Sequence, residues 1–196
     1  PLPFDLTALQ ITANKRFGFK AQTTLDLAQS LYEKKVLSYP RTSSRYLGED
    51  MVSDVSKIVD KCFASGLIKS KPNTIETFCF DNSKLSDHYA IIPTGENLDS
   101  LASLTKDEKI LFDLVLKQFI TALFPKCIKD KVNYTLSFDT EEEPLKLTAV
   151  SIVEQGWRAF GEDEKEVSES EESEIQDIPK LELNTVYSVI DKQVKE

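Results

Sequence analysis

The sequence predicts an α+β protein, in which a mainly helical part at residues 1–124 precedes a β-rich part at residues 125–196. Over much of the first part, apolar residues recur at intervals of three and four, which is the period of a helix buried on one side. From about residue 126 onward, apolar residues alternate with polar ones, which is the period of a half-buried strand. With 40% hydrophobic residues, a chain of 196 residues is long enough for a packed core.

Two helices are expected near the N-terminus. The first follows Asp5 or Thr7, either of which can cap a helix, and it ends before Gly18. The second opens at Thr23, because Asp26 three residues later resembles the partner of a capping box. A short turn that contains glycine joins the two helices, so the pair is a helix-turn-helix candidate.

Two further helices are expected in the helical part. Residues 51–65 have apolar positions on one face, and Gly66 closes the segment. Thr105 and Glu108 form a second capping box, which opens a helix that ends at Leu123. Helices therefore dominate residues 1–124.

Strands are expected in both parts. Short ones are predicted at residues 36–39 and 77–80, and residues 86–95 are an apolar run between turn residues. Alternation predicts longer strands at 132–138 and 145–151.

A final pair of strand-like segments contains Val186, and the acidic segment 162–174 is predicted to be a charged loop. The β-rich part has no clear closing element. We therefore expect the chain to be a piece of a larger protein.

Charge is distributed unevenly along the chain. The net charge is -9, yet residues 1–48 hold seven Lys/Arg against three Asp/Glu, while residues 139–196 hold six against seventeen. A basic N-terminal region within an acidic chain leaves an anion-binding site open. No apolar run is long enough for a membrane helix, and no signal peptide pattern is present, so we expect a cytoplasmic protein without a membrane partner.

The chain has three cysteines and one histidine. Cys62, Cys79 and Cys127 are far apart in the sequence, with no CxxC pair, so we expect reduced, structural thiols and no metal site in this chain. Trp157, in an acidic neighbourhood, is expected to be a core aromatic residue.

Tyr39 has an unusual setting, because Pro40 follows it and Arg41 and Arg45 lie close behind. A tyrosine on a short strand is commonly a core residue with its hydroxyl at the surface. Guanidinium groups, however, bind phosphate through charge-assisted bonds, and Thr42, Ser43 and Ser44 add further donors. Both interpretations are open from these residues alone. The same holds for His88, which is either a surface histidine or a group that faces Tyr39.

The segment LYEKKVLSYPRTSSRYL resembles the active-site segment of type IA DNA topoisomerases, and its Tyr-Pro-Arg is most like the bacterial topoisomerase III branch. Further segments resemble the same family in the same order: PLPFDLTALQITANKRFGF before the tyrosine, DHYAIIPT after it, and then VSIVEQGWRAF and IPKLELNTVYSV. The resemblance covers nearly the whole chain.

This resemblance implies an isomerase that cuts and reseals one DNA strand through a 5′-phosphotyrosyl intermediate. It implies that Tyr39 is the nucleophile, that Arg41 binds the scissile phosphate, and that His88 lies close to the cleavage site. Weaker assignments as DNA-binding residues follow for Thr42, Ser44, Arg45, Thr94, Lys15, Arg16 and Lys20.

The resemblance also implies a winged-helix-like fold for the tyrosine-bearing domain and a gate (arch) domain for the β-rich part. It implies DNA as the partner, single-stranded at the cleavage site, and a monomer in the cytoplasm at the nucleoid.

Two departures from the family pattern matter. Ser43 stands where the family often has an acidic residue. The chain also lacks the pattern of a Toprim domain, whose acidic residues bind Mg²⁺ in the complete enzyme. We therefore expect no cofactor in this piece and no activity from it alone. The alternatives are a noncatalytic winged-helix DNA-binding module, with Tyr39 in its core, and a structural domain that binds a partner through the acidic β segment.

Overall fold

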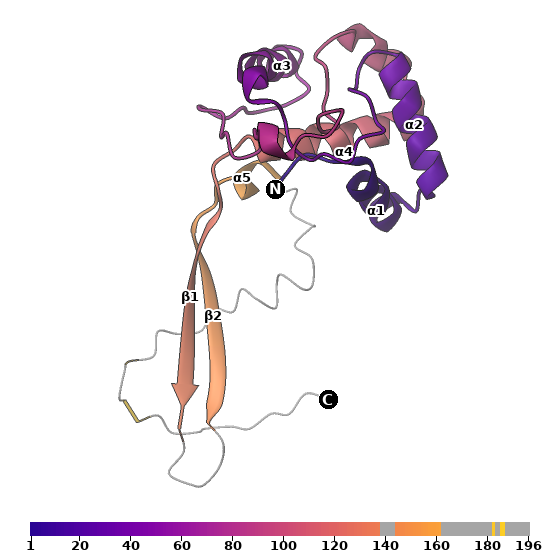
Figure 1. Cartoon of the computed structure of the whole chain (residues 1–196). Helices are drawn as coiled ribbons and strands as arrows, with labels where there is room; N and C mark the ends of the chain where they lie inside the picture. The colour runs from indigo at the N-terminus through magenta and orange to yellow at the C-terminus, as the bar shows by residue number, and fades with distance from the viewer. Residues whose placement is uncertain (138–143, 162–181, 183–184, 187–196) are drawn as a thin grey trace. The chain divides into compact units, whose positions relative to one another are not determined.

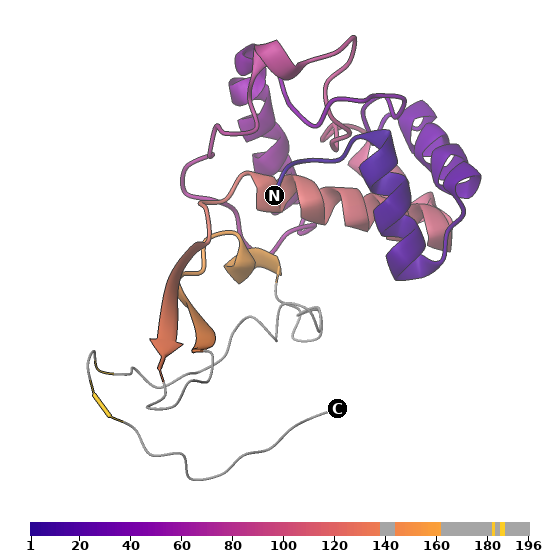
Figure 2. The ribbon, with the colours of Figure 1, turned by 60° about the horizontal axis from the view of Figure 1, so that its bottom comes forward.

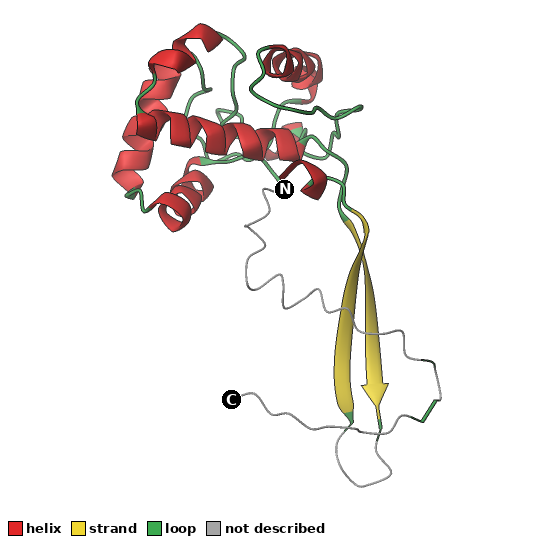
Figure 3. Cartoon of the chain, turned by 180° about the vertical axis from the view of Figure 1, so that it is seen from behind, coloured by secondary structure: helices red, strands yellow, loops and turns green. Residues whose placement is uncertain are grey.

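The computed structural model describes residues 1–137, 144–161, 182, 185 and 186. The chain divides into two compact units (Figure 1). The described part of the first unit consists of residues 1–127 and 155–161, and the described hairpin of the second consists of residues 128–154 without 138–143. Figure 3 shows the helices in the first unit and the strands in the second. The structure therefore combines helices with a small sheet, as the sequence predicts. The domain boundary after residue 124 and the winged-helix assignment stay predictions.

The first unit is built around one long helix, α4 (Lys106–Ala122). Helices α1 (Leu6–Phe17), α2 (Ala21–Glu33) and the short α5 (Arg158–Gly161) pack against α4, and Figure 2 shows α1 beside it. Ten of the 17 residues of α4 are buried, so this helix forms the centre of the core. Helix α3 (Val52–Ala64) contributes its buried face to the same core. Three short 3₁₀ segments complete the unit: η1 (Glu49–Met51), η2 (Asn82–Lys84) and η3 (Leu98–Ser103).

Most predicted helix ends are confirmed. The Asp5 carboxylate accepts a hydrogen bond from the Ala8 amide at 2.6 Å, so Asp5 rather than Thr7 caps α1. At the other end Gly18 has φ 72°, a left-handed conformation that glycine adopts without steric cost. The capping box of α4 is also present: the Glu108 amide donates to Thr105 Oγ1 at 3.3 Å, and the Thr105 amide donates to Glu108 Oε2 at 2.9 Å.

The predicted capping box of α2 is wrong. The helix begins at Ala21, two residues before Thr23, and its N-terminal flanking residue Lys20 makes no side-chain cap. The Thr24 amide already donates to the Lys20 carbonyl at 2.9 Å, so Thr23 lies inside the helix. Asp26 instead accepts a hydrogen bond from Gln22 Nε2 at 2.7 Å, which is an ordinary i, i+4 pair on a helix surface.

The two short strands predicted in the helical unit do not form. Residues 36–39 make a single antiparallel bridge, between Leu37 and Pro93. Proline has no amide hydrogen, so Pro40 and Pro93 limit the length of any ladder at this point. Residues 77–80 form a turn, with one parallel bridge from Leu47 to Phe80.

The second unit contains an antiparallel hairpin, β1 (Ile128–Leu136) and β2 (Leu145–Glu154). Leu136 lies opposite Leu145, and the register shifts only between Ile128 and Lys129. The two predicted longer strands are therefore confirmed as a pair. The predicted acidic loop at 162–174 lies outside the described residues, as does most of the final pair of strand-like segments.

Cys62 and Cys79 are buried, and burial raises the pKa of each thiol to about 11. All three cysteines are free thiols, as expected. Trp157 is half-buried, beside the Arg158 guanidinium at 5.3 Å from its ring centroid. In the described part of the chain, no helix is long and apolar enough to cross a bilayer.

Candidate active site

Tyr39 lies at the end of a backbone segment that is held firmly in place. Just before it, the Ser38 amide donates to the Ile92 carbonyl at 2.9 Å, and Ser38 Oγ donates to the Ala90 carbonyl at 3.1 Å. The Ile92 amide in turn donates to Ser38 Oγ at 2.9 Å. Ser38 and Pro40 are both buried, while Tyr39 between them is half-buried. The backbone therefore fixes the position of Tyr39 and leaves its ring partly open to solvent.

Two aromatic side chains contact the Tyr39 ring. The His88 ring lies 4.6 Å away between centroids, at an interplanar angle of 53°. The Tyr32 ring lies 5.3 Å away at 74°, which is an edge-to-face contact. The structure thus brings His88 to Tyr39 from 49 residues along the chain. His88 is exposed, so its imidazole is accessible to a ligand that reaches Tyr39.

The two arginines after Tyr39 have different surroundings. Arg41 is exposed and makes no hydrogen bond or ion pair with any residue that the structure describes. Arg45, by contrast, donates from Nε to the Pro3 carbonyl at 3.0 Å and from a terminal nitrogen to the Leu2 carbonyl at 3.2 Å. Arg41 is available for an anion, whereas the guanidinium of Arg45 anchors the N-terminal segment.

The hydroxyl groups that were predicted to contact DNA donate hydrogen bonds to backbone carbonyls of the protein. Thr42 Oγ1 donates to the His88 carbonyl at 3.0 Å, and Ser44 Oγ donates to the Lys84 carbonyl at 3.1 Å. Thr94 Oγ1 donates to the Lys35 carbonyl at 2.6 Å. Thr42 and Ser44 are buried, so in this structure both hydroxyls hold the loops around Tyr39 together. A DNA-binding role for them stays a prediction.

The basic residues of the N-terminal region lie at the junction of α1 and α2. Lys15 and Arg16 are in the last turn of α1, and Lys20 precedes α2. All three are exposed, and none lines the cleft at Tyr39. Phosphate contacts by these residues stay a prediction.

An open cleft of about 590 Å³ surrounds the Tyr39 side chain. It is lined by Tyr32, Glu33, Lys35, Leu37, Ser38, Tyr39, His88, Tyr89, Thr94 and Glu96. The sequence interpretation did not assign Lys35, Tyr89 or Glu96 to the site. Their signal was weak, because a lysine, a tyrosine and a glutamate near a motif are ordinary surface residues until the fold places them in one cleft.

The family profile described as DNA topoisomerase matches residues 1–196, which is the whole chain. The chain belongs to this family.

Curated relatives agree with the family match. The chain is 35% identical over 196 residues to DNA topoisomerase 3 of Bacillus subtilis (strain 168), a match that covers 96% of the chain and 26% of the relative. It is 36% identical over 194 residues to DNA topoisomerase 3 of Bacillus licheniformis, a match that covers 95% of the chain and 26% of that relative. The chain thus spans about a quarter of the length of the curated relatives that it matches. The interpretation of the sequence as type IA DNA topoisomerase is confirmed.

A solved structure shares the fold. Full-length topoisomerase I from Thermotoga maritima superposes with a TM-score of 0.64 at 20% sequence identity, over 93% of this chain and 29% of that one. At this level of identity, the similarity is evidence for the fold alone.

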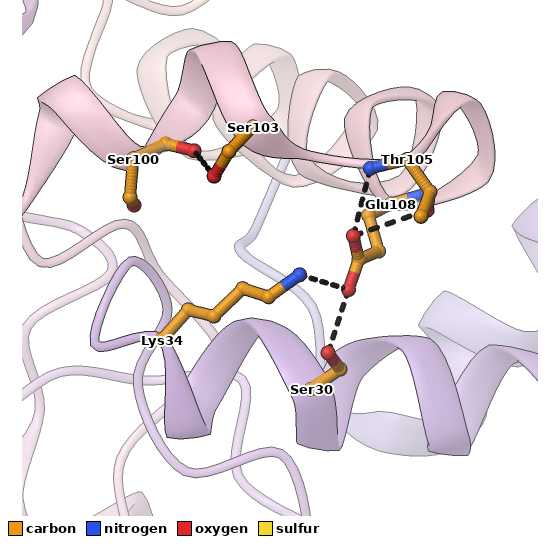
Figure 4. Close-up of polar contacts among 6 residues, drawn as sticks. All are labelled: Ser30, Lys34, Ser100, Ser103, Thr105 and Glu108. Carbon is orange, nitrogen blue, oxygen red and sulfur yellow. Dashed lines mark hydrogen bonds and ion pairs between the residues drawn. The ribbon is translucent and has the colours of Figure 1, made fainter.

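In this topoisomerase chain, a charged cluster holds the end of α2 next to the cleft (Figure 4). Glu108 Oε1 accepts hydrogen bonds from Lys34 Nζ and Ser30 Oγ, each at 2.6 Å, and Oε2 accepts from the Thr105 amide. The Glu108 side chain is only 5% exposed. Burial alone would raise the pKa of Glu108, but the Lys34 ammonium and the three further donors from Ser30 and Thr105 lower it to about 2. The cluster therefore ties α2 to α4 through an ionised, fully bonded carboxylate.

The two carbonyls that directly follow α2 also have side-chain partners. Asn97 Nδ2 donates to the Lys34 carbonyl at 2.9 Å, and Thr94 Oγ1 donates to the Lys35 carbonyl. Thr94, the last residue of the DHYAIIPT motif, and Asn97 just after it thus hold the backbone between α2 and Tyr39.

The donor groups of the described residues do not fit a resident metal. No group of three or more His, Cys, Asp or Glu side chains comes together there as a metal site requires. Glu33 and Glu96 line the cleft, but a pair of carboxylates without a third protein ligand is a poor match for a dedicated Mg²⁺ site.

Proposed function

We propose that this chain carries the nucleophile of a type IA DNA topoisomerase, an isomerase that changes DNA topology by cutting and resealing one strand. The observation that carries the proposal is the setting of Tyr39. Its half-buried ring contacts His88 at the wall of an open cleft, and two residues further along the chain lies the guanidinium of Arg41, which is exposed and makes no ion pair with a described residue. We propose single-stranded DNA as the substrate at the cleavage site.

In the forward step, the phenol oxygen of Tyr39 attacks a backbone phosphorus atom and the bond from phosphorus to the 3′ oxygen breaks. The phenol loses its proton, the 3′ oxygen gains one and leaves as a free 3′ hydroxyl, and the strand on the other side of the break stays bonded to Tyr39 through its 5′ phosphate. Resealing is the reverse step. The phosphotyrosyl bond keeps the energy of the phosphodiester bond, so the exchange requires no nucleotide cofactor.

Arg41 and His88 are each proposed to support this chemistry. The Arg41 guanidinium is exposed and has no partner among the described residues, so it is suited to bidentate binding of a phosphate and to stabilising the negative charge that develops on the phosphoryl oxygens. His88 contacts the Tyr39 ring, which places its imidazole close enough to contact the scissile phosphate or to move a proton.

Mg²⁺ is proposed to act in the complete enzyme, where it would help to position and neutralise the phosphates of the DNA. Because the described residues of this chain do not fit such a site, we propose that a Toprim domain outside the chain binds it. We further propose that the complete enzyme is a monomer that works in the cytoplasm at the nucleoid.

A noncatalytic winged-helix DNA-binding module is the alternative. It would use the basic N-terminal region and leave Tyr39 in the core. The half-exposed position of Tyr39 in a cleft does not favour this alternative.

The 196-residue chain by itself is expected to be inactive, because it contributes only one half of the proposed catalytic centre. The measurement is incubation with a single-stranded oligonucleotide and Mg²⁺, followed by denaturing gel analysis for cleaved or protein-linked DNA. The complete enzyme serves as the positive control, and mass spectrometry should place its DNA adduct on Tyr39. Efficient cleavage by the isolated chain would contradict the expectation, and an adduct on another residue would contradict the proposal.

Arg41→Ala in the complete enzyme is expected to reduce the cleavage rate by about 10²–10³-fold, the usual effect of removing one donor that stabilises developing charge. The same variant should leave the unfolding temperature nearly unchanged, because Arg41 is exposed and makes no hydrogen bond or ion pair with a described residue. Arg45→Ala is the matched comparison. It should lower the free energy of unfolding by about 1–3 kcal/mol, because the carbonyls of Leu2 and Pro3 lose charged donors. A reversed pattern, with Arg41 structural and Arg45 catalytic, would contradict these assignments.

A further inference from the structure

The cleft beside Tyr39 contains groups that strand cleavage does not use. Tyr89 and Lys35 line it together with the proposed nucleophile, yet neither has a part in attack on the phosphorus. One is an aromatic ring and the other a cation, which are the two kinds of side chain that single-stranded nucleic acid requires of a binding surface.

Tyr89 presents a partly open ring to the cleft. Its side chain is 39% exposed. Unlike Tyr32, it has no aromatic contact and no side-chain hydrogen bond with any residue in the described part of the chain. Burial, followed by the influence of nearby Tyr32, raises the pKa of its phenol, so the ring is neutral and does not repel a polyanion. An exposed neutral ring in a cleft is a stacking surface for a nucleobase.

Lys35 is the only lysine or arginine among the described residues that line the cleft. Its backbone has φ 61°, a left-handed conformation in which residues other than glycine are strained by roughly 1–2 kcal/mol. Two hydrogen bonds hold that conformation: the Lys35 amide donates to the Tyr32 carbonyl at 2.8 Å, and Thr94 Oγ1 donates to the Lys35 carbonyl at 2.6 Å. The ammonium group itself has no partner among the described residues.

We propose that the cleft binds one unpaired nucleotide of the DNA strand next to the cleavage site, with its base stacked on Tyr89 and its phosphate paired with Lys35. The base must be unpaired, because stacking on a protein ring within a cleft requires a free base face. The volume of about 590 Å³ is within the range of roughly 300–1,000 Å³ that is usual for sites of small organic ligands.

Two carboxylates in the cleft limit how many phosphates of the DNA it can hold. Glu33 and Glu96 also line it, and both would repel a phosphate. Glu33 accepts a hydrogen bond from Gln29 Nε2 at 3.2 Å on the surface of α2. Lys35 is the group in the cleft that attracts a phosphate, and the two carboxylates disfavour a second phosphate. We therefore expect the cleft to hold one nucleotide and not a longer stretch of the DNA backbone.

This inference rests on the proposed function for the identity of the polymer, but its test is independent of strand cleavage. The experiment measures binding of a fluorescent single-stranded oligonucleotide to the 196-residue chain in which Tyr39→Phe removes the nucleophile. Each position of the oligonucleotide is replaced in turn by an abasic nucleotide, for the parent and for Tyr89→Ala. Circular dichroism and thermal unfolding check that each variant is folded.

Tyr89→Ala is expected to weaken binding by about 5- to 150-fold, the effect of losing one base stack. One abasic position should weaken the parent by a similar factor and leave the Tyr89→Ala variant unaffected, since both changes remove the same contact. Tyr89→Phe, which keeps the ring, should bind like the parent. Lys35→Ala should weaken binding and reduce the slope of log affinity against log salt by about 0.7, the value for one phosphate contact on single-stranded DNA.

Lys69→Ala is the charge control, because Lys69 is exposed, makes no hydrogen bond or ion pair with a described residue and lies outside the cleft. An effect of Lys35→Ala no larger than that of Lys69→Ala would overturn the phosphate contact. Absence of coupling between Tyr89 and every abasic position would overturn the base contact, and absence of any binding at about millimolar chain would overturn both. If instead Tyr39→Phe leaves adduct formation intact in the complete enzyme while Tyr89 couples to a base, the proposed function fails and the nucleotide site remains.

Discussion

Tyr39→Phe in the complete enzyme is expected to abolish the covalent DNA adduct, because the phenol oxygen is the atom that bonds to phosphorus and phenylalanine lacks it. The ring contacts with Tyr32 and His88 depend on the aromatic face, which phenylalanine retains. Noncovalent binding of single-stranded DNA should therefore change little. The measurement is denaturing gel analysis of labelled DNA for the adduct, with anisotropy for binding.

Tyr32→Phe is the matched control for this prediction. Tyr32 lines the same cleft and packs edge-on against Tyr39, but it has no proposed bond to phosphorus. Loss of its hydroxyl should leave adduct formation possible. Adducts that persist in Tyr39→Phe would remove Tyr39 from its role, and loss of DNA binding in the same variant would indicate that the hydroxyl has a structural function.

Glu108→Gln is expected to lower the free energy of unfolding by about 2–3 kcal/mol. In the native chain the pKa of Glu108 falls from 4.5 to about 2. At about 1.4 kcal/mol per pKa unit, this shift corresponds to roughly 3 kcal/mol of stabilisation. Glutamine keeps the size of the side chain but removes the negative charge that binds Lys34. Its NH₂ group is a donor, so it cannot accept the hydrogen bonds that one of the two carboxylate oxygens accepts in the native chain.

The same shift sets the pH range of the effect. A carboxylate whose folded pKa is depressed stabilises the fold fully above its unfolded pKa, and this contribution is lost as the pH falls through the folded pKa. The native chain should therefore exceed Glu108→Gln in stability by the full amount above about pH 4.5, and the difference should shrink towards pH 2. Chemical denaturation of both proteins at several pH values measures it.

Asp107→Asn is the control, because Asp107 is an exposed carboxylate in the same helix turn that makes no hydrogen bond or ion pair with a described residue. Its cost should be at most about 1 kcal/mol, the usual size of a charge effect at a helix N-terminus. Equal losses for the two variants, or a loss in Glu108→Gln that does not depend on pH, would contradict the role of the buried ion pair.

Local signals in the sequence were sufficient for much of the fold. Asp5 and Gly18 mark the ends of α1, and the pair Thr105 and Glu108 marks the start of α4, because a cap and its amide lie within a few residues of each other. The alternation around residues 132–136 and 145–151 likewise predicted the hairpin β1–β2. The same kind of signal failed at Thr23, where α2 starts two residues earlier without any side-chain cap. Helix α2 packs against α1 and α4, and packing of this kind supplies most of the stability of a helix in a folded protein, so no side-chain cap is required.

The candidate site was predicted less completely than the fold. Tyr39, Arg41 and His88 were assigned through the resemblance, and the structure places His88 against Tyr39. Nothing local distinguishes Arg41 from Arg45, since both are arginines in one basic segment. Only the packed chain brings the carbonyls of Leu2 and Pro3 to Arg45 and leaves Arg41 exposed.

The sequence by itself therefore determined the helical and β-rich character of the chain, most helix ends, the hairpin and the family with its tyrosine. The tertiary structure alone decided which distant groups meet: Tyr32 and His88 at Tyr39, Lys35 and Tyr89 in one cleft, and Lys34 with Glu108 across 74 residues. The physical reason is the distance along the chain over which each kind of interaction acts. Caps and periodicity act within one or two turns of chain, whereas these contacts depend on how α2 packs against α4 and on where residues 88–97 close over the end of α2.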